Sequence, residues 1–275
     1  MSRKRITQLF PWLLPIRKKQ RLICFYTGMK FDHNHYSVQR SETLLPYQIY
    51  KSNCPMYNRE TGFDMVYQEN KVFNLKLAAA TLNKIVICPN ETFSFWKLVR
   101  NADKHIPYKE GLMVSDGVIK TLPGGGLCQI SNLLFWLFLH TPLTIVERHS
   151  HAIRDFPEPQ SDAPIGVDAT VSEGWLDLKV RNNTDYTFQI VITFDSTNII
   201  GQILTDNDTG LVFKVTNGPL FYYRKDGKVF EEVDVIQDAF LAASGINTST
   251  KLLYRNHCEI GYQLSDDTKI KTINA

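Results

Sequence analysis

The chain has 275 residues, of which 43 % are hydrophobic and 21 % are charged, so it is long enough and apolar enough to bury a large core. The net charge of +3 is too small to indicate a nucleic-acid-binding protein. The five cysteines are scattered and no two form a CxxC pair, which argues against a disulfide framework and favours a reducing, cytoplasmic location.

The N-terminal region, residues 1–69, begins with a basic arm and then gives few secondary-structure signals. Basic side chains cluster in residues 3–21 around a short apolar run that Pro11 and Pro15 interrupt. This run is too broken for a signal peptide and too short to span a bilayer. We expect either peripheral contact between residues 3–21 and the anionic inner face of a membrane, or an arm that is solvated or docked on the core.

A helix is predicted to begin at Asn70, which can act as its N-cap, and to end near Asn83, because apolar residues recur along one stripe. A short buried strand and an aromatic segment follow. A hairpin over residues 112–122, with its turn at Asp116-Gly117, then leads the chain to a run of glycines.

The strongest signals lie where Gly124, Gly125 and Gly126 precede Cys128 and a helix over about 127–139. The helix is apolar on nearly all sides, which is typical of a helix buried in the core. Three consecutive glycines indicate a sharp turn or a close approach to the backbone. A cysteine in the first turn is stabilised as a thiolate by unpaired N–H groups and by the helix dipole.

Alternating residues after Pro142 predict a strand over 144–153 with His149 and His151 on one face. A second strand, 166–172, would carry Asp168, Thr170 and Ser172 on one face. Two further strands would complete an antiparallel meander packed on the apolar helix.

These patterns predict an α+β fold in which a buried apolar helix packs on an antiparallel β-sheet, with a β-rich C-terminal extension. The predicted organisation is an N-terminal region, a central domain and a β-rich region at residues 1–69, 70–195 and 196–275. No motif in the chain points to a cofactor.

Six short motifs occur in the order and spacing of one known family: FSF at 93–95, YKE at 108–110, GGGLCQIS at 124–131, ERHSH at 147–151, GVDATVSEG at 166–174 and DLKVRNNT at 177–184. Together they resemble the VanW family. The resemblance implies a link to glycopeptide (vancomycin) resistance and to peptidoglycan precursors or cell-wall stem peptides, and it implies no particular reaction.

One hypothesis for the site is a cysteine enzyme that acts on amide bonds. Cys128 would be the nucleophile, His151 or His149 the base, and Asp168 the group that orients the imidazole. The element order is similar to that of papain-like and transglutaminase-like hydrolases or transpeptidases, an analogy of order alone. Gln129 or the glycine amides would stabilise an oxyanion.

A second hypothesis is a module that binds a cell-wall peptide without turnover. The amides of Gly124, Gly125 and Gly126 would hold a carboxylate, and Arg148 and Arg154 would add charge-assisted bonds.

The remaining alternative is that the same residues serve the fold. Cys128 would be a small packing residue, the two histidines a polar edge, and Asp168 a turn residue at a strand end. Zinc bound by Cys128, His149 and His151 lacks a fourth ligand at clear spacing, so no metal site is predicted.

Overall fold

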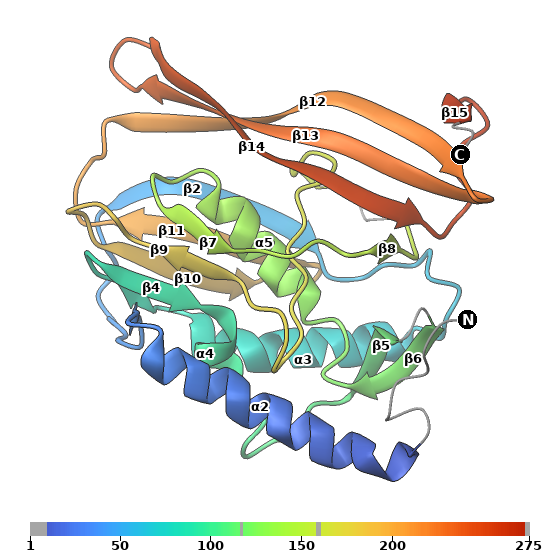
Figure 1. Ribbon diagram of the computed structural model, residues 1–275. Helices are drawn as coiled ribbons and strands as arrows, with labels where there is room; N and C mark the ends of the chain where they lie inside the picture. The colour runs from blue at the N-terminus through green and yellow to red at the C-terminus, as the bar shows by residue number, and fades with distance from the viewer. Residues whose placement is uncertain (1–9, 116–117, 158–160, 273–275) are drawn as a thin grey trace.

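The computed structural model describes residues 10–115, 118–157 and 161–272 (Figure 1). The first residues of the basic arm and the expected Asp116-Gly117 turn lie outside these ranges.

The helical elements are η1 (Pro11–Leu13), α2 (Leu14–Phe31), α3 (Val66–Leu82), α4 (Phe95–Val99) and α5 (Cys128–Phe138). The strands of the first half are β1 (His35–Tyr36), β2 (Tyr47–Pro55), β3 (Val86–Ile87), β4 (Glu91–Ser94), β5 (Glu110–Ser115), β6 (Val118–Pro123) and β7 (Thr144–Glu147). The later strands are β8 (Ile153–Arg154), β9 (Lys179–Arg181), β10 (Phe188–Phe194), β11 (Asn198–Thr205), β12 (Leu211–Lys225), β13 (Lys228–Leu241), β14 (Asn247–Ile260) and β15 (Ile270–Thr272).

Three sheets and a hairpin surround α5 in the described part of the chain. One sheet has the order β1-β4-β9-β7 and a second, wholly antiparallel, has the order β2-β11-β10-β3. The third, β15-β12-β13-β14-β8, contains the long C-terminal strands, which lie across the top of the molecule in Figure 1. The predicted α+β class with a β-rich C-terminal extension is confirmed.

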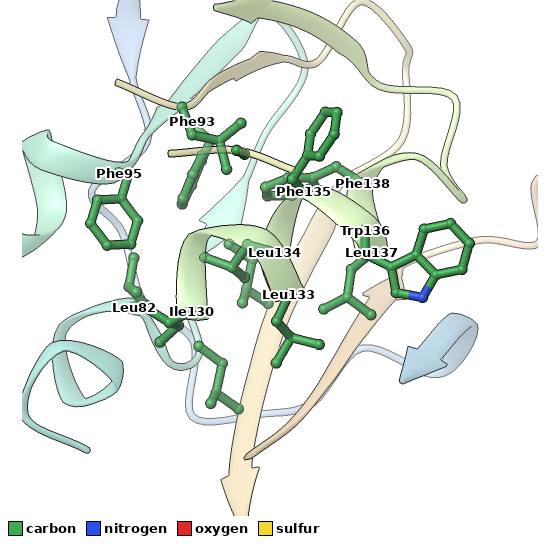
Figure 2. Close-up of a cluster of buried hydrophobic side chains, with 14 of the residues drawn as sticks. Leu82, Phe93, Phe95, Ile130, Leu133, Leu134, Phe135, Trp136, Leu137 and Phe138 are labelled. Atoms are coloured by element: carbon green, nitrogen blue, oxygen red, sulfur yellow. The ribbon is translucent and has the colours of Figure 1, made fainter. Parts of the chain in front are cut away.

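Helix α5 is the centre of the core. Its apolar side chains are buried on several sides, with Leu82, Phe93 and Phe95 among their neighbours (Figure 2). The helix can approach β11 closely because Gly201 has no side chain: a Cβ there would lie 2.6 Å from Leu137 Cδ1. The predicted buried helix and its bounds are therefore confirmed to within one residue at each end.

Helix α3 begins earlier than the sequence predicted. Its first turn is bonded to Asp64, whose Oδ1 accepts from the Val66 N–H at 2.9 Å, so Asn70 lies inside the helix and is not its cap. Asn70 instead donates its Nδ2–H to the Glu110 carbonyl at 2.9 Å and ties α3 to the β5–β6 hairpin. The predicted end near Asn83 is confirmed.

The predicted strand over 144–153 is confirmed over Thr144–Glu147 and is wrong beyond it, because the chain leaves one sheet at Glu147 and joins another at Ile153. The backbone between them bonds elsewhere: the His151 N–H donates to a carboxylate, and the His149 carbonyl accepts from the Thr170 N–H. Alternation in the sequence fits an extended connection over residues 148–152 as well as it fits a strand.

The predicted strand over 166–172 is also wrong, since its one ladder contact is the isolated bridge between Ser172 and Leu176. The last two strands of the predicted meander, β9 and β10, belong to different sheets. Strand β9 pairs with β7 and β4, whereas β10 pairs with β11 and β3. Residues 166–172 form an extended segment that lies along α5, and we call it the crossing segment.

Helix α2 was not predicted, and it lies along the lower edge of the molecule in Figure 1. Its contacts with the core include buried Met29 and a hydrogen bond of 2.6 Å from the Tyr26 hydroxyl to Glu173. Among the helices described, none has the length and apolar character needed to cross a membrane.

Candidate active site

Two polar residues of the first turns of α5 fix the crossing segment against the helix. Ser131 Oγ donates to the Ala169 carbonyl at 2.6 Å, and Asn132 Oδ1 accepts from the Ala169 N–H at 2.8 Å. Because both backbone groups of Ala169 are held, its neighbours Asp168 and Thr170 have fixed positions. The polarity at the start of α5 therefore positions the next functional segment.

Asp168 holds His151 through two hydrogen bonds. The imidazole Nδ1 lies 2.8 Å from Asp168 Oδ1, and the His151 N–H donates to Oδ2 at 2.6 Å. The Asp168 side chain is 6 % exposed, whereas the His151 side chain is 35 % exposed. The carboxylate is thus sealed behind the imidazole, while the ring retains an accessible edge.

Cys128 lies in the first turn of α5 and is half-buried. Its Sγ lies 3.3 Å from Thr170 Oγ1 and 3.6 Å from the Val171 carbonyl oxygen. The His151 imidazole lies close enough to this thiol to lower its pKa. The helix start, the crossing segment and the residues between β7 and β8 therefore converge on one sulfur atom.

The three side chains shift one another's protonation. Burial by itself would raise the pKa of Cys128, but the His151 imidazole brings it below its ordinary value. Burial would lower the pKa of His151, but the hydrogen bonds and charges of Asp168 and Cys128 raise it well above its ordinary value. Burial would raise the pKa of Asp168, and the contact with His151 lowers it. The arrangement favours a thiolate beside an imidazolium.

The other predicted histidine belongs to a different cluster. His149 Nε2 lies 3.0 Å from Glu147 Oε1, and Glu147 also pairs with Lys179 at 2.9 Å. The sequence left both histidines open as the base, and the structure brings only His151 to Cys128 and Asp168. Within the described residues, no three His, Cys, Asp or Glu side chains are arranged to hold a metal ion.

Two of the three glycines, Gly125 and Gly126, are packed tightly against neighbouring backbone and side chains. A Cβ on Gly125 would lie 2.3 Å from the Gly111 carbonyl carbon, and a Cβ on Gly126 would lie 2.2 Å from Lys71 Cγ. Gly124 and Gly126 have φ of +81° and +94°, which favours glycine at both.

Two of the amides expected to bind a ligand already have acceptors within the chain. The Gly124 N–H donates to the Lys109 carbonyl at 3.2 Å, and the Gly125 N–H donates to the Leu122 carbonyl at 3.1 Å. The glycine run therefore sets the position of the α5 start relative to the hairpin.

The other residues expected at a binding site are engaged in the fold. The Gln129 side chain donates to the Pro55 carbonyl and to Cys54 Sγ. Arg148 donates to the Asp168 carbonyl and to Asn256 Oδ1, and it lies over the Tyr254 ring at 4.0 Å. The contacts of Arg148 tie the crossing segment to the C-terminal sheet.

Arg154 forms an ion pair of 3.2 Å with buried Glu231. The structure thus does not bring Arg148 or Arg154 together with the glycine amides.

Two residues, one at the Cys128 sulfur and one against the glycine run, were not singled out from the sequence. Thr170 contacts the Cys128 sulfur, and its alternation with Asp168 in the sequence was a usable signal for it. Lys71 lies across Gly126, and burial lowers the pKa of Lys71 to about 8. No local pattern marks Lys71, because its place depends on packing between α3 and α5.

Comparisons with known proteins agree with the motifs. A family model described as "VanW like protein" matches residues 70–204. The chain is 54 % identical to the Vancomycin B-type resistance protein VanW of Enterococcus faecalis (strain ATCC 700802 / V583) over the full length of both chains. It is 32 % identical to the uncharacterized protein YoaR of Bacillus subtilis (strain 168) over 50 % of this chain and 46 % of that protein. No solved structure matches the chain.

Proposed function

This chain belongs to the VanW family, and from that membership and the site around Cys128 we propose that it serves glycopeptide resistance as a thiol-dependent enzyme. Its substrates would be amide bonds in peptidoglycan precursors or cell-wall stem peptides. The link to vancomycin resistance comes from the name of the relative that is 54 % identical over its full length. The reaction is inferred from the site alone.

The observation that carries the proposal is that one imidazole, His151, is held by Asp168 and also lowers the pKa of the Cys128 thiol. The carboxylate binds the Nδ1 side of the imidazole at 2.8 Å, and the ring acts on the thiol and lowers its pKa. A nucleophile, a base and a group that orients the base are the parts of a catalytic triad. A histidine that served only packing would not need a carboxylate bonded to both its ring and its backbone N–H.

The chemistry follows from these protonation states. The Cys128 thiolate would attack the carbonyl carbon of an amide, and the C–N bond would break as the His151 imidazolium gives its proton to the leaving amine. This leaves a thioester on Cys128. Water would then lose a proton to the imidazole and attack the thioester, which releases a carboxylic acid and restores the thiolate beside the imidazolium. An amine in place of water would give transpeptidation.

Charge on the carbonyl oxygen would be stabilised by the start of α5. The N–H groups of Leu127 and Cys128 have no acceptor among the described residues, as is usual for the first turn of a helix. They carry the positive end of the helix dipole and lie beside the nucleophile. The Gln129 amide, considered for this role from the sequence, is bonded to Pro55.

The test is turnover of defined stem peptides by the purified protein, with products identified by mass spectrometry. Cys128→Ala should abolish turnover and leave the circular dichroism spectrum unchanged. Cys88→Ala is the matched control, because Cys88 is another half-buried thiol and lies outside the site. Hydroxylamine should release a hydroxamate if the thioester forms.

Equal turnover by wild type and Cys128→Ala would contradict the enzyme proposal. So would binding of the peptides without any turnover by the wild-type protein, which is the behaviour of a binding module.

A further inference from the structure

The outer surface of α2, together with the short helix η1 that precedes it, carries apolar side chains that the fold leaves exposed. Trp12, Ile16 and Ile23 are 68 %, 59 % and 58 % exposed. Positions 16, 19, 23 and 30 recur at the spacing of one helix face. Lys19 lies between the two isoleucines on this face, and Lys30 follows them two turns later. We call Trp12, Ile16, Lys19, Ile23 and Lys30 the outer face of α2.

This face is separate from the one that holds α2 to the domain. The docked side includes Leu22, which lies against Gly174, Tyr26, which bonds Glu173, and Met29, which is 5 % exposed. Arg100 lies over the Tyr26 ring at 4.0 Å. Because the docked side supplies the anchoring contacts, the exposed isoleucines and lysines are not needed to hold α2 in place.

The charge around the outer face has one sign. Residues 10–31 contain Arg17, Lys18, Lys19, Arg21 and Lys30 and no acidic residue. The chain as a whole has a net charge of only +3, so this segment is strongly basic against a nearly neutral background. Two copies of such a face would repel each other, whereas an anionic surface would attract it.

We infer that the outer face of α2 is a docking surface for an anionic lipid bilayer. The isoleucines and Trp12 would enter the boundary between headgroups and acyl chains while the lysines extend to the phosphates. The helix would lie flat on the membrane, parallel to its surface. This inference does not depend on the proposed chemistry at Cys128.

The test is co-sedimentation of the full chain with vesicles of phosphatidylcholine alone or of phosphatidylcholine mixed with phosphatidylglycerol. Wild type should bind the mixed vesicles and not the neutral ones, and high salt should release it. Ile16→Ser with Ile23→Ser, and separately Lys19→Glu with Lys30→Glu, should each weaken binding about tenfold or more.

Matched controls change similar residues on the C-terminal sheet and in its β13–β14 connection. Ile246→Ser with Leu252→Ser removes two apolar side chains that are 61 % and 54 % exposed, and Lys225→Glu with Lys251→Glu reverses two exposed charges. Both controls should bind the mixed vesicles as wild type does.

Three outcomes would overturn the inference: no binding of wild type to the mixed vesicles, equal loss in the α2 variants and the controls, or self-association of the free protein in sedimentation velocity that Ile16→Ser with Ile23→Ser abolishes. The last result would assign the outer face to a second copy of the chain.

Discussion

The carboxylate of Asp168 holds His151 by its ring and by its backbone at once, at 2.8 Å and 2.6 Å. The double contact fixes both the rotation of the imidazole and the path of the chain that carries it. It also explains why residues 148–152 leave the expected strand, since the His151 N–H bonds a side chain in place of a neighbouring strand.

Asp168→Asn should retain this geometry and lose its charge. The Asn carbonyl oxygen can still accept one of the two N–H groups, but the imidazolium loses its anionic partner. The pKa of His151 should fall and the pKa of Cys128 should rise, so alkylation of Cys128 at neutral pH should slow about tenfold or more. The measurement is the rate of modification by iodoacetamide as a function of pH, and an unchanged profile would mean that Asp168 serves the fold alone.

The two histidines should differ in the same assay. His151→Gln should slow Cys128 modification, because the imidazole that lowers the pKa of the thiol is gone. His149→Gln should leave the rate within about twofold of wild type, because His149 pairs with Glu147. A reversed order would place His149 at the site.

A buried carboxylate away from the site should make stability depend on pH. Burial raises the pKa of Asp177 to about 6, while its oxygens accept from Ser94, Trp96 and Leu178. A raised pKa means that the folded state holds a proton that the unfolded state has lost. The unfolding free energy should therefore fall as pH rises from about 4 to about 6, by on the order of 2 kcal/mol.

Asp177→Asn should remove this fall, because an amide can accept the same N–H groups without carrying charge. Urea unfolding of both proteins across that pH range is the check. An equal pH dependence in the variant would assign the effect to other carboxylates.

The close contact between Gly111 and Gly125 should not tolerate a side chain at either position. Gly125→Ala places a Cβ 2.3 Å from the Gly111 carbonyl carbon and should lower the unfolding free energy by about 1–3 kcal/mol. Gly28→Ala is the control: Gly28 lies within α2 with nothing within 4 Å of its Cβ position, and alanine there should stabilise by up to about 1 kcal/mol. Thermal unfolding of both variants distinguishes a local clash from a general effect of alanine.

The sequence was informative where one local signal decided the structure. Helix α5 could be bounded because an apolar run is preceded by glycines and followed by Pro142. Cys128, His151 and Asp168 could be selected because their residue types and element order suit one chemistry. Helix α2 could not be found, since its docked face consists of a few positions and most of its surface is exposed.

Relationships between distant segments were beyond local patterns. The alternation over 144–153 did not reveal that the His151 N–H bonds a carboxylate on another segment. The contact between Gly111 and Gly125 depends on how the hairpin meets α5. The choice between His149 and His151 likewise required the position of Glu147, whose carboxylate pairs with His149.

The most direct test of the account is the pH profile of Cys128 alkylation in the native protein, resolved site by site by mass spectrometry. Cys88 is the internal control, because it is also half-buried and burial raises its pKa. Cys128 should react faster than Cys88 at pH 7 and stay reactive well below about 8.5, the ordinary thiol pKa. A Cys128 that reacts no faster than Cys88, or that reacts only as pH approaches that value, would contradict it.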